Sequence, residues 1–379
     1  MNQDQIEFNK TLGQKQKEAS VKGCLRGGDE QAGCAGKIVQ AHSIQRGKIL
    51  ASIADGGSGK VYYLGLAPAD DMTSMIPEFK LEGIKKFSTF SGFCGWHDKS
   101  IFQPIEDVVF TATAKQKDIY AYRAAAKELH ANLESKRLCE IQLGDKLGVE
   151  DFPPHLQAML PLILQGLVEV PPFIKKAMLE GAAKQQIKIR HKQCEHNIAE
   201  LRQICDDLTG AIDHDHPSEF EHVYHSLEGA CPVACCTSYI PYFDHDGNRI
   251  ISEQDERRMA LSRATRCLEM KNVMLNVFPE AGRTHFIFTF SKGNQTFKDA
   301  IERLLKLDNG SLRIGLSNIL LNYAENSAYG PNYIEENFSP EQITALKEAF
   351  SSTVFDPSAF RKGSINLFVE AISVPPSNR

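Results

Sequence analysis

The stretch that decides the fold of the N-terminal part of the chain is Gly92-Phe93-Cys94-Gly95-Trp96-His97-Asp98. A cysteine and a histidine stand three residues apart in it, and Phe102 and Ile105 follow at helical spacing. The pair is therefore predicted to open a helix. Thiolate and imidazole are ligands that Zn²⁺ prefers, and a C-x-x-H pair is half of a tetrahedral site. A second half-site is expected elsewhere in the chain.

The second half of this metal site is predicted at Cys24 and Cys34, which lie among glycines near the N-terminus. Nine residues separate them, more than the two to four that are usual between zinc ligands. The sequence predicts one structural Zn²⁺ held by Cys24, Cys34, Cys94 and His97. The alternative is that both cysteines are loop thiols and that His97 is a surface histidine beside Asp98.

A second motif, Ala41-His42-Ser43-Ile44-Gln45, lies between the two half-sites. With it, residues 20–107 resemble the HNH (ββα-metal) endonucleases, which carry a treble-clef zinc module. The resemblance implies that His42 is the general base that activates water. It also implies that Asp98, standing where the family has a metal-binding histidine, holds a catalytic Mg²⁺ or Mn²⁺.

Two features depart from the family pattern. No asparagine stands just before Cys94, and the 51 residues between His42 and Cys94 exceed the usual spacing. A structural role for His42 is the alternative, with its ring bonded to a backbone carbonyl at a strand end. Glu106, on the same predicted helix as Asp98, is either a second carboxylate near the metal or an exposed helix residue.

Composition limits the classes of protein that the chain can belong to. The 379 residues carry 43 Lys+Arg against 48 Asp+Glu, a net charge of −5, which excludes a general coat for nucleic acid and leaves only a local binding surface. The longest apolar window, Leu156–Val170, is shorter than the roughly 20 residues that span a bilayer and predicts a buried helix. No secretory signal precedes it, so we expect a cytoplasmic protein with reduced cysteines and no membrane contact.

An α+β, multidomain architecture is expected, with a zinc-stapled, treble-clef-like domain over 1–112, a helical, coiled-coil-like hairpin over 113–213 and an α+β domain over 214–379. In the middle range a heptad seam extends over 187–212. Its members are Ile187, His191, Cys194, Ile198, Leu201, Cys205, Leu208 and Ile212. The seam needs a partner helix, supplied either by residues 118–141 of the same chain or by a second copy or another protein. His191 is expected to be neutral and packed.

The last range predicts strands near 220–227, 233–243, 272–278 and 285–290, followed by helices near 297–307, 314–324 and 340–350. In the fourth strand Phe286, Phe288 and Phe290 alternate with other residues, so one face is predicted to be aromatic and buried while His285 points the other way. The remaining cysteines, Cys139, Cys194, Cys205, Cys267, Cys231, Cys235 and Cys236, are expected to be buried hydrophobic residues.

Two further polar clusters are weaker candidates for metal binding. The run 213–216, with His222 and His225 after it, is read as a polar hinge in preference to a metal site, because histidines three apart on a strand lie on opposite faces. The segment Asp244–Asn248 begins like a calcium loop, but Arg249 occupies the position of the required glycine, so a turn is predicted.

The resemblance to the HNH endonucleases implies a nuclease that hydrolyses phosphodiester bonds, with nucleic acid, DNA in preference to RNA, as its partner. Such a protein would suit antiviral defence against foreign nucleic acid. The alternative is a catalytically inactive, zinc-stapled binding or assembly protein. P-loop nucleotide hydrolysis and serine esterase chemistry are unsupported, because neither G-x-x-x-x-G-K-[ST] nor G-x-S-x-G occurs.

Overall fold

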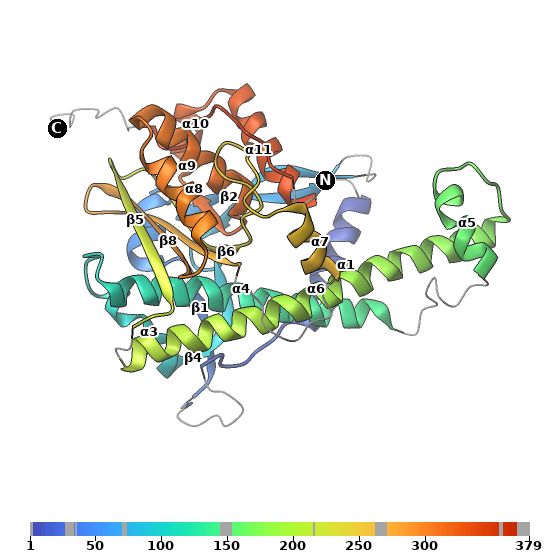
Figure 1. The fold of residues 1–379 in the computed structure, drawn as a ribbon, viewed down its shortest axis with the longest axis horizontal. Coiled ribbons are helices and arrows are strands. Elements are labelled where there is room, and N and C mark those ends of the chain that lie inside the picture. Colours follow the sequence, from blue (N-terminus) through green and yellow to red (C-terminus); the bar gives the residue numbers. More distant parts are fainter. Residues whose placement is uncertain are drawn as a thin grey trace. The chain divides into compact units, whose positions relative to one another are not determined.

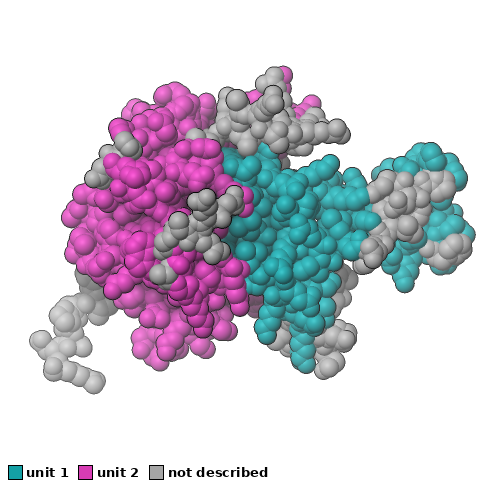
Figure 2. Space-filling view, turned by 90° about the horizontal axis from the view of Figure 1, so that it is seen from below, with its two compact units in different colours: residues 1–21, 129–200 teal, residues 22–128, 201–379 magenta. Residues whose placement is uncertain are grey.

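The computed structural model describes residues 3–26, 34, 36–69, 74–144, 154–214, 217–261, 271–355 and 359–369 (Figure 1). The chain forms two compact units, one of residues 1–21 and 129–200 and the other of residues 22–128 and 201–379 (Figure 2). The unit boundaries fall inside two long helices, α4 (Ala114–Leu143) and α6 (Pro172–His214). The α+β class predicted from the sequence is confirmed.

The larger unit, residues 22–128 and 201–379, is built on a seven-stranded antiparallel sheet in the order β3-β2-β9-β6-β7-β8-β5. Its strands are β2 (Lys60–Pro68), β3 (Met75–Gly83), β5 (Phe220–Glu228), β6 (Val233–Tyr239), β7 (Val273–Glu280), β8 (Arg283–Ser291) and β9 (Ser327–Tyr329). The hairpin β2–β3 joins the sheet through one residue pair, Tyr62 opposite Tyr329. Strands from both ends of the sequence therefore share one sheet.

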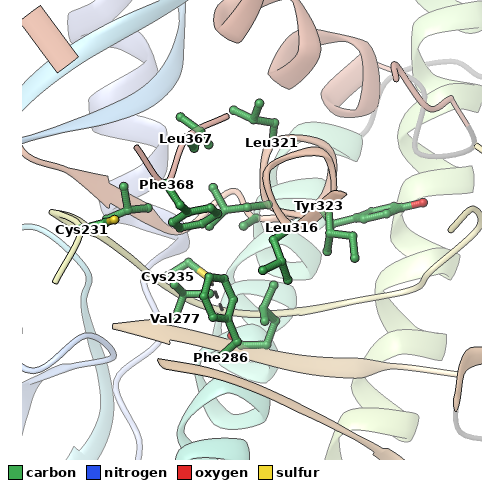
Figure 3. Packing of buried hydrophobic residues seen from close by; sticks show 14 of the residues in the cluster. Cys231, Cys235, Val277, Phe286, Leu316, Leu321, Tyr323, Leu367 and Phe368 are labelled. Carbon is green, nitrogen blue, oxygen red and sulfur yellow. Dashed lines mark hydrogen bonds between the residues drawn. The ribbon is translucent and has the colours of Figure 1, made fainter. Parts of the chain in front are cut away.

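One face of this sheet carries the main hydrophobic core. Phe286, Phe288 and Phe290 of β8 are buried there, as predicted, against the helices that follow. Figure 3 shows Phe286 among other members of this core. These helices are α8 (Gln295–Leu305), α9 (Asn309–Tyr323), α10 (Pro331–Asn337) and α11 (Pro340–Phe355). Asn294 caps α8 by accepting from the Phe297 N–H group, and Asp308 caps α9 in the same way. Another helix, α7 (Glu253–Leu261), precedes β7.

The other face of the sheet is covered by the first half of α4. The ring of Tyr120 stacks on Phe278 with centroids 4.7 Å apart, and Asn276 donates to the Tyr120 carbonyl at 3.1 Å. His285 lies on this face, as predicted, and Phe110 packs on its ring. The strands β6, β7 and β8 are therefore buried on both faces.

A small two-stranded sheet with a helix forms a separate element of the larger unit. Strand β1 (Ile38–His42) pairs antiparallel with β4 (Thr89–Cys94), and α3 (Gly95–Glu106) follows β4 directly (Figure 1). The segment inserted between the two strands contains the π-helix η1 (Arg46–Leu50), α2 (Ala51–Ile53) and the hairpin β2–β3. The long spacing between His42 and Cys94 thus accommodates two strands of the large sheet.

The smaller unit contains α1 (Gln3–Ala19), α5 (Pro154–Leu164), the second half of α4 and most of α6. The two long helices run antiparallel in it. Asn197 donates to Asn132 at 3.2 Å, Lys136 pairs with Glu195 at 3.1 Å, and His191 lies 3.3 Å from Glu140. This is the internal hairpin, one of the two alternatives left open by the sequence, and a homodimer or partner protein on the 187–212 seam stays a prediction.

The structure bears on three further expectations from the sequence. The helix predicted to be buried within Leu156–Val170 is partly exposed, with 43% of Leu162 and 68% of Leu167 accessible. His191 is half-buried beside two glutamates, because it lies where the seam opens to solvent. The ranges 1–112, 113–213 and 214–379 do not coincide with the two units, and the three-part division stays a prediction.

Candidate metal centre and catalytic histidine

The four predicted zinc ligands converge on one point in the larger unit. The Nδ1 atom of His97 lies 3.2 Å from the sulfur of Cys24, 3.5 Å from that of Cys34 and 3.3 Å from that of Cys94. All four ligand atoms lie within 4.8 Å of one another. The wide gap between Cys24 and Cys34 therefore does not prevent them from sharing a site, and the cluster can hold a metal ion.

Local structure brings these ligands together. Cys94 ends β4 and His97 lies in the first turn of α3, so the C-x-x-H spacing turns both side chains toward one point. The strand also holds Cys24, because the N–H groups of its neighbours donate to carbonyls of Ser91 (3.3 Å) and Gly92 (2.9 Å). A Cβ at Gly92 would lie 2.6 Å from the Phe90 ring, so only glycine leaves room for that ring at this position of β4.

The spacing of the ligand atoms fits zinc. Bond lengths of about 2.3 Å to sulfur and about 2.0 Å to nitrogen, at the tetrahedral angle, separate the two ligand atoms by about 3.5 Å. The three sulfur-to-nitrogen distances are 3.2, 3.5 and 3.3 Å. Soft sulfur ligands in a compact group of four also favour zinc over the oxygen-seeking cations.

The close packing of these ligands shifts their pKa values. Burial and the neighbouring thiols Cys24 and Cys94 raise the pKa of Cys34 to about 11. Burial also acts to raise the pKa of Cys94, but N–H groups of His97 and Trp96 donate to its sulfur, and the net shift is downward. Burial lowers the pKa of His97, which keeps the imidazole neutral and able to bind metal. Three thiolates this close are stable together only beside a positive charge.

His42, the predicted general base, ends β1 at the edge of the small sheet. Its Nε2 lies 3.1 Å from the carbonyl oxygen of Ile84. A carbonyl only accepts, so Nε2 carries the proton and Nδ1 keeps its lone pair. Burial, with Arg46 nearby, lowers the pKa of His42. The ring is therefore a neutral base at pH 7 in a fixed tautomer.

Asp98 lies in the first turn of α3 and is half-buried, and burial raises the pKa of its carboxyl. The ion pair of buried Arg123 and half-buried Glu106 influences both Asp98 and His42, since the charges of Arg123 and Glu106 act on the pKa of each. Arg123 is 1% exposed, pairs with Glu106 at 2.5 Å and stacks over Phe102 at 4.1 Å. The pKa values of the two residues predicted to be catalytic thus both depend on the charges of this ion pair.

Two residues of this site were missed by the sequence reasoning. Ile84 contributes only its backbone carbonyl, which no sequence pattern reports. Arg123 lies inside α4, where an arginine reads as an exposed helix residue; its apolar neighbours Tyr122, Ala124 and Ala125 were the one signal of its burial. Glu106, read from the sequence either as a second carboxylate near the metal or as an exposed helix residue, is half-buried and pairs with Arg123.

The weaker metal candidates have other structural roles. His222 contacts Thr289 and Asp118 on one face of the sheet, whereas His225 lies opposite Phe286 on the other, as expected. Asp244 accepts from the N–H groups of Asp246 and Asn248 and closes the predicted turn. The cysteines expected to be buried are so wherever described, and Cys267, Asp215 and His216 lie outside the described residues.

Comparison with protein-family models, curated proteins and solved structures finds no match to this chain. Across the described ranges, no helix combines the length and the apolar run needed to cross a bilayer.

Proposed function

We propose that the chain is a zinc-containing nuclease that hydrolyses phosphodiester bonds with the help of a second, divalent cation. The observation that carries the proposal is the state of His42. Its Nε2–H group is held by the Ile84 carbonyl, and its pKa is lowered, so Nδ1 is available to accept a proton near pH 7. The carbonyl supplies the orientation that HNH enzymes obtain from an asparagine, which is absent before Cys94.

The order of elements around His42 supports the same proposal. Strand β1 carries the base, β4 and α3 carry Cys94 and His97, and α3 also carries Asp98. This is the strand, strand, helix order expected of a ββα-metal module, with the second strand displaced along the sequence by the inserted hairpin. Zn²⁺ at the four-residue cluster would act structurally, because four protein ligands leave no open position.

In the proposed reaction, Nδ1 of His42 takes a proton from water as the oxygen attacks the phosphorus. The bond from phosphorus to the leaving oxygen breaks, and that oxygen receives a proton from solvent. Asp98 would hold Mg²⁺ or Mn²⁺, which when bound supplies charge stabilisation to the phosphoryl oxygens. Within the described ranges no salt bridge engages Asp98, whereas Glu106 is taken by Arg123. Asp98 is thus the carboxylate better placed for this role.

A zinc-stapled binding or assembly protein is the second candidate. The pairing of Glu106 with Arg123 favours it, because it removes one of the two carboxylates expected near the catalytic cation. A half-buried histidine that donates to a backbone carbonyl is also a common structural arrangement.

The experiment that separates the two candidates is cleavage of single-stranded and duplex DNA and RNA in the presence of Mg²⁺ or Mn²⁺. We expect His42→Ala to lower the rate by about 10²- to 10⁴-fold, the usual contribution of a general base, without loss of zinc. Asp98→Asn should lower the rate and raise the concentration of Mg²⁺ or Mn²⁺ that is required.

Matched controls are His155→Ala in α5 and Asp107→Asn at the end of α3, both exposed residues outside the site. An unchanged cleavage rate in His42→Ala would show that His42 is not the general base and that another residue has this role. Absence of cleavage of every substrate by the wild-type protein with bound zinc would favour the binding protein.

A further inference from the structure

A cavity lies beside the metal cluster on the side of His97. Its volume is about 380 Å³, within the range of about 300–1,000 Å³ in which small ligands bind. Its lining residues come from α3, the start of α4, the end of α6 and the segment that carries Cys24. They are Arg26, Trp96, His97, Ser100, Ile101, Pro104, Lys115, Ile119, Ile212 and Asp213. None of the residues assigned to catalysis lines it.

The lining combines an apolar floor with an accessible aromatic ring. Ile101, Ile119 and Ile212 are buried. Trp96, the single tryptophan of the chain, is 55% exposed although it lies on the cavity wall. Its indole packs by an edge against the ring of His97, with centroids 4.7 Å apart at 71°. An exposed indole at a cavity of this kind is a stacking surface for a flat ring.

Two polar features face the same cavity. His97 is 93% buried, its Nδ1 is turned toward the three sulfurs, and the described residues offer no hydrogen-bond partner for its Nε2. A metal-binding histidine ordinarily donates this second N–H to an acceptor. Lys115 and Arg26 both bring positive charge to the cavity wall; Arg26 pairs with Asp213, and its guanidinium donates to Thr209 at 2.9 Å.

We propose that this cavity binds a single nucleotide, with the base stacked on Trp96, an acceptor of the nucleotide on the His97 Nε2–H group, and the phosphate near Lys115. The choice of ligand class rests on the proposed nuclease function. Two sources share this chemistry: an unpaired nucleotide of a nucleic acid strand and a free nucleotide. A base in a closed duplex cannot enter, so the site would favour unpaired or extruded bases.

Fluorescence of Trp96 tests the proposal directly, because no other tryptophan contributes to the signal. The probes are adenosine monophosphate, inorganic phosphate, a short single-stranded oligodeoxynucleotide and the same sequence as a closed hairpin duplex. They are titrated into zinc-loaded protein carrying His42→Ala, which prevents turnover. We expect saturable quenching by the single strand and by the mononucleotide, and none by phosphate or duplex. Quenching by the mononucleotide alone would support the site with a free nucleotide as its source.

Lys115→Glu should weaken binding by about tenfold, the effect of removing one charge-assisted contact. Lys99→Glu is the matched control, since Lys99 is exposed on α3 and does not line the cavity. Equal affinities for both variants, or no saturable quenching by any probe, would overturn the inference. Cleavage by the wild type without a change in Trp96 fluorescence would support the nuclease function and rule out the nucleotide site in this cavity. Saturable binding without cleavage by the wild type would support the nucleotide site and argue against the nuclease function.

Discussion

At the scale of single residues, the four metal ligands differ in how firmly the fold holds them. Cys94 and His97 belong to one continuous strand and helix, so their spacing is set by local backbone geometry. Cys24 depends on hydrogen bonds to β4. Cys34 has a pKa raised to about 11, and it is the thiol that gains most from a bound cation. Loss of any of the thiols leaves the others without a complete site.

We predict that wild-type protein contains one zinc ion per chain and that Cys94→Ser abolishes zinc binding, because a serine hydroxyl is a poor zinc ligand. Elemental analysis of protein purified without chelator measures both values. Cys139→Ser is the control, since Cys139 is as buried as Cys94 but lies in α4 outside the cluster. Zinc-free wild type, or a full zinc content in Cys94→Ser, would contradict the prediction.

The second residue-scale prediction concerns pH. Burial lowers the pKa of His42 below its ordinary 6.5, and only the deprotonated ring can act as a base. Activity should therefore be lost as pH falls through this lowered value, and at pH 6.5 more than half of it should remain. The pH–rate profile measures this point, and NMR titration of the His42 ring measures it without turnover. A ring that titrates above pH 6.5 would be inconsistent with this assignment.

At the scale of elements, the helical hairpin shows how burial changes along one helix. On α6, the seam residue Ile198 is 8% exposed, whereas Ile189, which lies off the seam, is 42% exposed. Along the seam itself, Ile187 and His191 are partly exposed, and the members from Cys194 onward are buried. Hydrogen bonds and ion pairs at Asn197 and Glu195 fix the register of the pair.

These two isoleucines provide a matched test of the hairpin. Ile198→Asp should lower the free energy of unfolding by about 3 kcal/mol or more, because it buries a charge without a partner. Ile189→Asp should change it by no more than about 0.5 kcal/mol, as surface substitutions do. Urea unfolding followed by helical circular dichroism measures both. Similar losses for the two variants would argue against the observed orientation of α6.

At the scale of the whole molecule, the metal cluster and the large sheet are connected through the inserted hairpin. The chain leaves β1 at His42, adds β2 and β3 to the sheet, and returns at β4. The cluster lies where the chain returns to β4 and α3, whereas β2 of the hairpin pairs with β9 of the large sheet. Binding free energy for the metal is folding free energy for the segments that the metal joins.

Removal of zinc by a chelator should therefore loosen the small sheet before the large one. We predict that the amides of Leu25 and Gly95, which donate to carbonyls of Gly92 and Lys37, lose hydrogen-exchange protection. Amides of β7 and β8 should stay protected, because their stability comes from the aromatic core. Simultaneous loss of protection in both regions would show that the two sheets unfold as one unit.

The sequence by itself determined the features that depend on local spacing. Alternation placed Phe286, Phe288 and Phe290 in the core, and heptad spacing identified the buried side of α6 from Cys194 onward. The C-x-x-H pair and its two distant cysteines named the four residues that do converge. Side-chain spacing carries this information because it decides which residues share a face, whatever the rest of the chain does.

Only the tertiary structure decided which segments meet. The pairing of β2 with β9, the cover of α4 over the second sheet face, and the approach of the Ile84 carbonyl to His42 all join distant parts of the chain. In each contact at least one partner is a backbone N–H or C=O group, and these groups are the same in every residue, so no sequence pattern marks that partner. The ion pair of Arg123 and Glu106 could not be predicted from the sequence for a related reason. A buried charge is stable only beside its partner, and packing alone reveals that the partner is there.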